Sequence, residues 1–377
     1  MSHPGSPATY ESAGVDLDAA DKAMALIGPL ARSTHRPEVL AGIGGFAGLF
    51  ELAADRYRRP VLVASTDGIG TKSVVAHQLG RFDTVGRDLV AMCVDDMVCE
   101  GAEPLFLLDN ISVGDLDAAQ VVDLVTGVAD GCRLAGAALL GGETAEHTGV
   151  MEPGEFDLAG FAVGVVERDN VLGAGRVRVG DVLVGLPSPG LRCNGYTLAR
   201  HVLCERAGLP LEGPAWPGAT VTLGEELLRP SVIYTPAVRA AIGASEVHAV
   251  AHITGGGFPG NIPRILPDDT RAVLDRSTWE LPGIFSEIRR LGAVSELEMS
   301  RVFNLGLGMV MVVAQGSEGQ AMAAARSVGI DARVVGGIES AESGEVGSGA
   351  PSSEAMAEGR LAFVGPTFWP EDGGQDL

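Results

Sequence analysis

The chain has 377 residues, 46% of them hydrophobic, which is enough apolar material for two globular domains. Its formal net charge of −22 argues against nucleic acid or an anionic membrane surface as a partner, because both repel an acidic protein. A small phosphorylated ligand remains compatible with this charge, because backbone N–H groups and metal ions can hold phosphate locally.

No feature of the sequence indicates export or membrane insertion. Residues 1–14, MSHPGSPATYESAG, are polar and lack the apolar core of a signal peptide, so we expect a flexible arm there. The chain contains no apolar run of about 18 residues, the length that spans a bilayer. The five cysteines form no CxxC pair and no metal-ligand spacing, which is typical of reduced thiols. We therefore expect a cytoplasmic protein.

In the first half of the chain, hydrophobic periodicity predicts alternating strands and helices. The expected elements are, in chain order, a helix at 16–32, a strand at 61–66, a helix at 83–100, a strand at 105–108, a helix at 118–134 and strands at 137–140 and 156–167. This alternation is typical of the α/β class. A charged, glycine-rich segment at 168–180 favours a domain boundary, so we expect a first domain over 15–167.

The second half predicts another series of strands and helices. Its expected elements are a strand at 181–186, a helix at 195–207, a strand at 247–253, a helix at 261–266, strands at 271–274 and 308–313, a helix at 318–328 and a strand at 332–335. We expect a second domain over 168–340. Residues 341–377 are rich in Gly, Ser, Glu and Pro, which favours a disordered tail; docking of its last apolar stretch, FVGPTFWP, is the alternative.

A phosphate-binding loop is predicted at residues 65–72, STDGIGTK, where the first strand ends. Its glycines, Gly68 and Gly70, let backbone N–H groups approach an anion without a Cβ in the way. Lys72 supplies a cation, and Asp67 supplies a ligand for a hard metal ion. The pattern does not satisfy the Walker A spacing, and an ordinary turn with a surface lysine is the alternative.

The helix expected at 83–100 carries an acid on the face that is expected to point to the interior. Asp96 continues an apolar stripe that begins at Leu89. Asp88 and Asp95 share a neighbouring face. A buried carboxylate is costly unless it is paired or bound to a metal ion, which favours a functional role. The alternative is that packing turns Asp96 towards solvent.

Two more acids follow apolar strands. Asp109 comes after LFLL and Glu143 after LLGG, where the two strands are expected to end. Ligands collect at the carboxyl ends of strands in open α/β sheets, so these acids would converge with Asp67 and Asp96 if the strands are parallel or share an edge. Several carboxylates beside a glycine loop are typical of a site for Mg²⁺ and a triphosphate.

Two strand–loop–helix junctions in the second half offer backbone amides to an anionic substrate, at 189–196 (PGLRCNGY) and at 254–258 (TGGGF). Simple connecting loops are the alternative. The stretch 42–47, GIGGFA, fits a dinucleotide-binding fingerprint but lacks the preceding apolar strand. A nicotinamide or flavin enzyme is therefore set aside.

These motifs, in this order, resemble the phosphoribosylformylglycinamidine cyclo-ligase (AIR synthetase) family. The resemblance covers roughly residues 10–340 and is carried by GIGGFAGLF, STDGIGTK, DLVAMCVDDMVCEGAEPLF, LLGGETAE, DLAGFAVGVVE, NGYTLAR, AHITGGGFPGNIPRILP and VFNLGLGM. It implies two α/β domains, each a mixed sheet flanked by helices, and a homodimer that pairs the amino-terminal domains. The implied activity is the ATP-dependent closure of formylglycinamidine ribonucleotide to aminoimidazole ribonucleotide, with ADP and phosphate, in purine biosynthesis.

Motifs and resemblance together predict the site residues. ATP is expected on Asp67, Gly68, Gly70, Thr71, Lys72, Asp88 and Asp109, Mg²⁺ on Asp67, Asp95, Asp96 and Glu143, and catalytic roles on Lys72, Asp96 and Glu143. The ribonucleotide is expected in a cleft towards the second domain, on Arg192, Asn194, Gly195, Thr254, Gly255 and Gly256.

The chain departs from the family pattern near the expected substrate site. The usual His-Ser is Arg192-Cys193, the usual Tyr after Asp109 is Asn110, the usual Met-Pro is His147-Thr148, and the Arg of PTRIY is Val232. An arginine binds phosphate or carboxylate but cannot shuttle protons near neutral pH. Three alternatives therefore stay open: a divergent paralogue with a related amide or amidine substrate, a phosphotransferase similar to thiamine-monophosphate kinase, and a catalytically silent nucleotide-binding protein.

Overall fold

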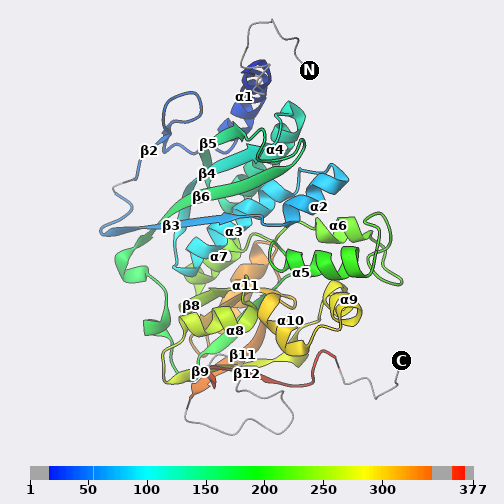
Figure 1. Cartoon of the computed structure of the whole chain (residues 1–377). Coiled ribbons are helices and arrows are strands. Elements are labelled where there is room, and N and C mark those ends of the chain that lie inside the picture. Colours follow the sequence, from blue (N-terminus) through cyan, green and yellow to red (C-terminus); the bar gives the residue numbers. More distant parts are fainter. Residues whose placement is uncertain (1–16, 54, 342–358, 370–377) are drawn as a thin grey trace, which may run out of the picture. The chain divides into compact units, whose positions relative to one another are not determined.

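The computed structural model describes residues 17–53, 55–341 and 359–369, and the chain divides into two compact units. The first unit takes in residues 1–97 and 104–167, and the second takes in residues 98–103 and 168–377. Each unit is built on one main β-sheet with helices beside it (Figure 1). This architecture confirms the α/β fold class predicted from the sequence.

The first unit contains one main sheet and a short two-stranded ribbon. Its elements are α1 (Leu17–Arg32), β1 (Val39–Ala41), β2 (Leu49–Phe50), β3 (Pro60–Gly68), α2 (Lys72–Leu79), α3 (Val85–Cys99), β4 (Glu103–Val113), α4 (Ala118–Ala135), β5 (Ala138–Glu146) and β6 (Phe156–Glu167). The main sheet has the strand order β3-β6-β4-β5. β3 pairs antiparallel with β6, and β4 pairs parallel with β5.

Helix α3 packs closely between the sheet and α4 because glycines line its contacts. A Cβ on Gly160 of β6 would lie 3.1 Å from Leu89 Cδ2. On the α4 side, a Cβ on Gly86 would come within 2.3 Å of the Leu124 carbonyl oxygen. Because the helix is enclosed from two directions, all but two of residues 85–98 are buried. This enclosure explains why the sequence of α3 is apolar on more than one face.

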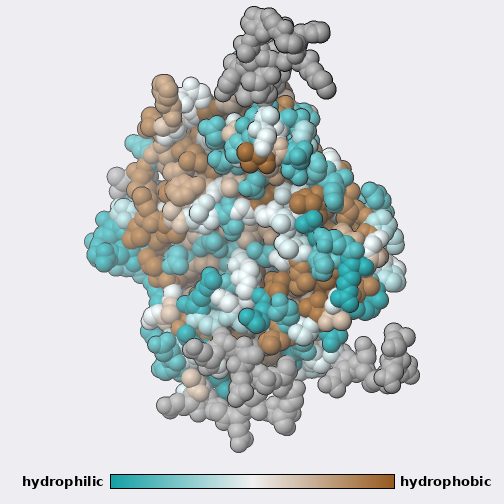
Figure 2. All heavy atoms as spheres, viewed as in Figure 1, coloured by the Kyte–Doolittle hydropathy of each residue, from teal (hydrophilic) through white to brown (hydrophobic). Residues whose placement is uncertain are grey.

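The opposite face of the same sheet carries exposed apolar side chains. Alternate residues of β3 from Pro60 to Thr66 are exposed, as the two-residue period of a strand dictates. Leu62 is 64% exposed, and Phe161 on β6 is 43% exposed. Figure 2 shows hydrophobic side chains gathered over this sheet. An apolar sheet face of this kind is typical of an interaction surface.

The second unit contains a six-stranded sheet in the order β12-β9-β11-β7-β10-β8. Its elements are β7 (Val182–Pro187), α5 (Tyr196–Arg200), α6 (Leu223–Leu227), α7 (Thr235–Ala244), β8 (Val247–His252), α8 (Gly257–Asn261), β9 (Thr270–Asp275), α9 (Gly283–Gly292), α10 (Glu296–Val302), β10 (Leu307–Val313), α11 (Glu318–Ser327), β11 (Arg333–Ser340) and β12 (Leu361–Val364). Neighbouring strands pair antiparallel, except that β12 runs parallel to β9.

The core of the second unit forms where β10 meets α7 and α11. Every residue of β10 is buried, and Met309 and Met311 pack with the alanine-rich faces of the two helices. Tyr234 precedes α7, is completely buried and donates a hydrogen bond from its hydroxyl to the Pro187 carbonyl oxygen at 2.7 Å. Within the described residues, no helix combines the length and the apolar composition needed to cross a bilayer.

The tail prediction is wrong for part of the chain. Residues 341–377 were expected to be disordered, but residues 361–364 form β12, in which Leu361 is 1% exposed and Phe363 is 8% exposed. The alternative, docking of FVGPTFWP, is confirmed for residues 363–369. The expected arm at 1–14 and the rest of the tail, at 342–358 and 370–377, lie outside the described residues.

Strand ends also differ from the prediction. β4 continues to Val113 and β5 to Glu146, so Asp109 and Glu143 lie inside strands and not beyond their ends. These two strands do run parallel, which was one of the conditions named for their acids to converge. Polar residues ended the hydrophobic runs in the sequence, whereas the backbone ladder continues through them because it does not depend on side-chain polarity.

Substituting Gly308 with alanine is expected to destabilise the second unit. An added Cβ would lie 2.2 Å from the Tyr234 hydroxyl, which is buried and hydrogen-bonded. Such overpacking costs about 1–3 kcal/mol. Gly319→Ala is the matched control, because this exposed glycine of α11 has nothing within 4 Å of an added Cβ. Urea unfolding should show a lower midpoint for Gly308→Ala alone; equal midpoints for both variants would contradict this packing.

Candidate functional site

The 65–72 segment and α3 bring two predicted acids together. The Ser65 hydroxyl donates a hydrogen bond to Asp96 Oδ2 at 3.4 Å. Burial, reinforced by the negative charges of Asp67 and Asp96, raises the pKa of the Cys93 thiol to about 12. Both acids therefore lie close to one point on α3, while the Gly68 amide donates to Asp67 Oδ1 at 2.7 Å. Cys93 itself stays a protonated, unreactive thiol at this point.

Lys72 and Asp88 form an ion pair in the interior of the first unit. The Lys72 ammonium lies 2.6 Å from Asp88 Oδ2, and both side chains are 0% exposed. The pair ties the start of α2, directly after the 65–72 loop, to α3. Breaking a buried pair by removing one partner costs about 3–5 kcal/mol, so this contact fixes the geometry of the loop. A direct contact of Lys72 with phosphate stays a prediction.

The acids that α3 buries differ from those expected. The sequence placed Asp96 on the buried stripe, but Asp88 and Asp95 are 0% exposed while Asp96 is only partly buried. The reason is that α3 is enclosed on two sides, so the neighbouring face is also interior. Asp96 is consequently the acid of α3 that a ligand can reach.

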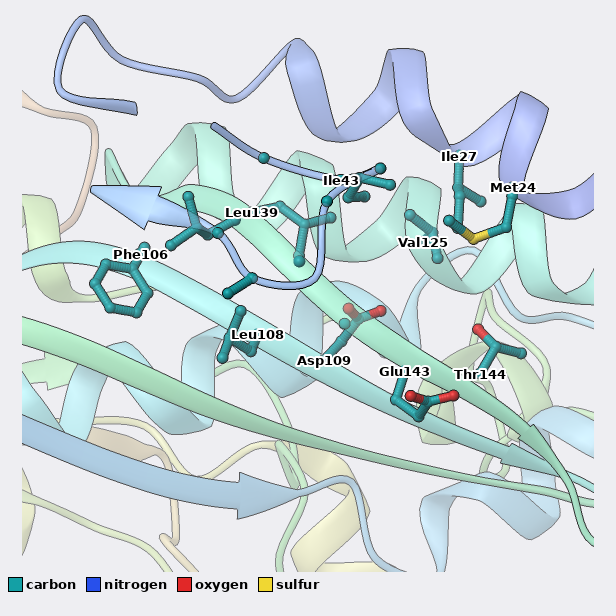
Figure 3. A pocket seen from close by; sticks show the side chains of 18 of the residues that line it. Met24, Ile27, Ile43, Phe106, Leu108, Asp109, Val125, Leu139, Glu143 and Thr144 are labelled. Carbon is teal, nitrogen blue, oxygen red and sulfur yellow. The ribbon is translucent and has the colours of Figure 1, made fainter. Parts of the chain in front are cut away.

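A cavity of 690 Å³ opens beside β4 and β5 in the first unit. Its walls are mostly apolar, with Met24 and Ile27 projecting from α1 (Figure 3). The lining residues are Met24, Ile27, Gly42, Ile43, Gly44, Gly45, Phe46, Ala47, Gly48, Phe106, Leu108, Asp109, Val125, Leu139, Leu140, Gly141, Gly142, Glu143, Thr144 and Phe161. Its size and its few polar groups are typical of a small-molecule site.

Three polar side chains line this cavity: Asp109 on β4, and Glu143 and Thr144 on β5. In the parallel ladder Asp109 lies opposite Gly142 and Glu143 lies opposite Asn110, so the two carboxylates point to opposite faces of the sheet (Figure 3). A Cβ on Gly142 would lie 1.8 Å from Asp109 Oδ1, so only glycine leaves room for this carboxyl. Burial raises the pKa of Asp109 to about 7. A cation in the cavity would offset this cost of ionisation.

The loop at 42–48 forms another wall of the cavity, which the sequence reading missed. Gly44 adopts a φ of 112°, and Gly48 packs so closely on β5 that a Cβ would lie 2.4 Å from Leu140 Cγ. Phe46, at the tip, is fully exposed. Four glycines within seven residues were the signal; they were set aside because the loop does not follow a Rossmann strand. Glycine backbone of this kind can donate N–H groups to phosphate.

The predicted acids lie at different places in the first unit. Asp67 and Asp96 lie near Cys93, whereas Asp109 and Glu143 line the cavity. Among the described residues, no group of three or more His, Cys, Asp or Glu side chains is arranged to hold a metal ion. Two carboxylates nevertheless fit Mg²⁺, which commonly completes its octahedron with substrate phosphates and water. The Mg²⁺ site predicted on Asp67, Asp95, Asp96 and Glu143 stays a prediction.

In the second unit, Arg192 is held in the interior at the 189–195 loop. Its guanidinium donates to the Val232 carbonyl oxygen at 2.8 Å and lies 4.7 Å above the Tyr234 ring. The same group is 3.0 Å from His252 Nε2, which must accept because guanidinium has no acceptor atom. Arg192 also has a φ of 64°, which few side chains adopt. The structure thus makes Arg192 an anchor of this loop, and its contact with substrate stays a prediction.

The two predicted substrate loops lie next to each other. The Asn194 side-chain nitrogen is 3.8 Å from where a Cβ on Gly255 would be. Asn194 Oδ1 is buried and has no hydrogen-bond partner, which marks an acceptor suited to a ligand donor. Asn261 fixes the second loop by donating to the Gly257 carbonyl oxygen at 2.8 Å. The remaining predicted residue, Thr254, begins that loop and is partly buried.

Two solved structures illustrate proteins with a similar fold. Thiamine-monophosphate kinase from Stenotrophomonas maltophilia aligns with a TM-score of 0.61 at 18% identity, over 90% of this chain and 95% of that one. Hydrogenase maturation protein HypE in complex with ATP aligns with a TM-score of 0.58 at 16% identity, over 84% and 86%. At these identities the likeness defines the fold alone.

Sequence comparisons define the family. Residues 51–166 match AIR synthase related protein, N-terminal domain, and residues 178–348 match AIR synthase related protein, C-terminal domain. A phosphoribosylformylglycinamidine cyclo-ligase of Anaeromyxobacter sp. strain Fw109-5 is 53% identical over 348 residues, covering 92% of this chain and 99% of the relative. The enzyme of that name from Myxococcus xanthus is 49% identical over 334 residues, covering 89% and 96%. The chain belongs to the phosphoribosylformylglycinamidine cyclo-ligase family, which confirms the resemblance seen in its motifs.

The buried carboxyl of Asp109 predicts a specific dependence of stability on pH. Its pKa rises from 3.8 to about 7 on folding, so the native state holds a proton that the unfolded state releases near pH 4. Stability is therefore lost as pH rises from about 4 to about 7, by at most ~4 kcal/mol. Asp109→Asn should melt like the wild type at pH 4 and at a higher temperature at pH 8. A difference in melting temperature that does not change with pH would contradict this assignment.

Proposed function

We propose that this chain is an ATP-dependent cyclo-ligase that converts formylglycinamidine ribonucleotide to aminoimidazole ribonucleotide, with ADP and phosphate, in purine biosynthesis. The observation that carries the proposal is the near-complete match to relatives of this name, which extends over 99% of the length of one of them. The substrate class rests on that family membership, because the fold alone also hosts kinases.

ATP is the proposed ligand of the cavity in the first unit. The apolar walls, including Met24 and Ile27, suit a purine base, and the glycine backbone at 42–48 suits phosphate oxygens. The exposed carboxylate of Glu143 would hold Mg²⁺ together with the phosphates, and Asp96 and Asp67 are further carboxylates for it. Bound Mg²⁺ would neutralise negative charge on the triphosphate.

The reaction explains why a phosphate donor is required. A formamide oxygen is a very poor leaving group, so attack by an amidine nitrogen on the formyl carbon stalls. Transfer of the γ-phosphoryl group to that oxygen converts it into phosphate, which departs when the nitrogen attacks and the imidazole forms. The protein contributes mainly orientation and charge stabilisation. Asn194 and the Gly255–Gly256 backbone are the proposed contacts of the ribonucleotide.

A single assay separates this activity from the alternatives. The purified protein should consume ATP and form aminoimidazole ribonucleotide only when formylglycinamidine ribonucleotide is present. ADP without an imidazole product would instead indicate a phosphotransferase, and binding without turnover would indicate a silent nucleotide-binding protein.

Loss of either accessible acid is expected to abolish turnover. Glu143→Gln and Asp96→Asn each remove a proposed Mg²⁺ ligand, and rates should fall by about 10²-fold or more. Asp21→Asn, on the exposed surface of α1, is the control and should keep wild-type rates. The ADP and imidazole products are measured together. Wild-type ATP turnover in Asp96→Asn and Glu143→Gln would refute the metal assignment.

A homodimer in the cytoplasm is proposed as the working state. Support for the dimer comes from the exposed apolar face of the β3-β6-β4-β5 sheet, and all five cysteines are free, as in a reducing compartment.

Placing a charge on this face should separate the subunits. Leu62→Glu would put a carboxylate into the apolar contact, because Leu62 is 64% exposed in the single chain. Val179→Glu, at a residue 59% exposed in the second unit, is the matched control. Sedimentation velocity should report a monomer for the first variant and a dimer for the second. A wild-type monomer, or a dimer of Leu62→Glu, would contradict the proposed interface.

A further inference from the structure

The end of the chain packs onto the second unit through an aromatic cluster. Residues 359–369 lie beyond residue 348, where the family match ends. β12 extends the sheet along β9, with Phe363 opposite Leu274. After β12, the Phe368 ring packs edge-on against Trp279 at 5.4 Å, and Trp369 donates from Nε1 to the Ser286 hydroxyl at 3.3 Å. Most of this segment is therefore held by specific contacts.

One of these contacts reaches the glycine loop of the proposed substrate site. The Phe363 ring meets the Phe258 ring edge-to-face, with centroids 5.6 Å apart. Phe258 directly follows the glycines 255–257 and is 0% exposed. Trp279 packs on the same ring at 6.2 Å. Edge-to-face contacts of this kind favour one position of the Phe258 ring. Phe363 therefore helps to fix the end of the 254–258 loop.

A second contact reaches the same loop through α10. The Thr367 hydroxyl donates to Glu296 Oε2 at 2.7 Å, and Arg276 pairs with the other oxygen of this carboxylate. Glu296 is the first residue of α10. Thr367 of the segment 359–369 and Arg276, the residue directly after β9, thus both hold the first residue of this helix.

Helix α10 in turn bears on both substrate loops. A Cβ on Gly257 would lie 1.9 Å from the Ser300 carbonyl oxygen, and a Cβ on Gly195 would lie 2.2 Å from the Phe303 ring. The backbone at Gly257 and Gly195 therefore packs directly against Ser300 and Phe303, with no room for an added atom. A shift of α10 would displace both glycines. Asn194 directly precedes Gly195, and Gly256 directly precedes Gly257; both are proposed ribonucleotide contacts.

We propose that residues 359–369 position the ribonucleotide site, with Phe363 acting on Phe258 directly and Thr367 acting through Glu296 and α10. This inference rests on the function proposed above. The two side chains do not touch substrate; they hold the backbone of the 254–258 loop in the conformation that the ribonucleotide meets.

The test compares two conservative variants in the full chain. Phe363→Leu keeps an apolar side chain but removes the ring contact, and Thr367→Val keeps the shape but removes the hydrogen bond to Glu296. Each should raise the KM for formylglycinamidine ribonucleotide about tenfold while the KM for ATP stays within about twofold. In both variants, the amides of residues 254–261 should exchange with deuterium faster than in the wild type.

Two control variants separate positioning from a general loss of stability. Val364→Ala changes an exposed residue of the same strand, and Val313→Ala removes buried volume at the far end of β10, where it pairs with Val247. Both should keep wild-type KM values and wild-type exchange at 254–261, although Val313→Ala lowers the melting temperature. Equal effects in Val313→Ala and Phe363→Leu, or unchanged exchange at 254–261 in Phe363→Leu, would overturn the inference.

Failure of the proposed function has a different signature. In that case the wild type would form no aminoimidazole ribonucleotide, yet the exchange comparison at 254–261 would still report whether Phe363 and Thr367 hold the loop. Slower exchange or no change there counts against the positioning role, and faster exchange in both variants supports it.

Discussion

The enclosure of α3 between β6 and α4 is the constraint on which the first unit depends. Gly160 and Gly86 allow backbones to approach so closely that α3 has interior on two sides. Acids on this helix must then be paired or shared with a ligand, because an isolated buried carboxylate is too costly. Asp88 satisfies this requirement with Lys72, and that pair carries the constraint on to the 65–72 loop. Substituting either glycine would therefore disturb the proposed nucleotide site from a distance.

Much of the fold followed from hydrophobic periodicity alone. The helix expected at 16–32 is α1, and the strand expected at 156–167 is β6, because long runs with one clear period leave little ambiguity. Elements such as α7 and α9 were missed, since proline and glycine at their starts resemble loop sequence. β12 was missed for another reason: its four residues sit within a composition typical of disorder, and only pairing with β9 reveals them.

The site was predictable in its residue types but not in its grouping. Motif reading found Asp109 and Glu143, and the structure places both in one cavity. It did not find the 42–48 wall, because that loop follows no long strand and resembles a different fingerprint. Motif reading also expected Asp96 to be the buried acid of α3. Which acids are buried depends on how many sides of the helix are covered, and the sequence does not show this. Arg192 was predicted as a substrate contact, which stays a prediction, and the sequence did not reveal that His252 and Tyr234 hold its side chain inside the unit. Such distinctions depend on contacts distant in sequence.

The parallel pairing of β12 with β9 has a consequence for the solution behaviour of the protein. An uncovered outer strand presents a row of free N–H and C=O groups that can recruit strands from other molecules. Here β12, a strand of four residues, covers the longer β9, so the outermost strand of the sheet is short. Proteolytic loss of β12 would therefore expose the backbone N–H and C=O groups of β9, and the shortened protein would tend to aggregate.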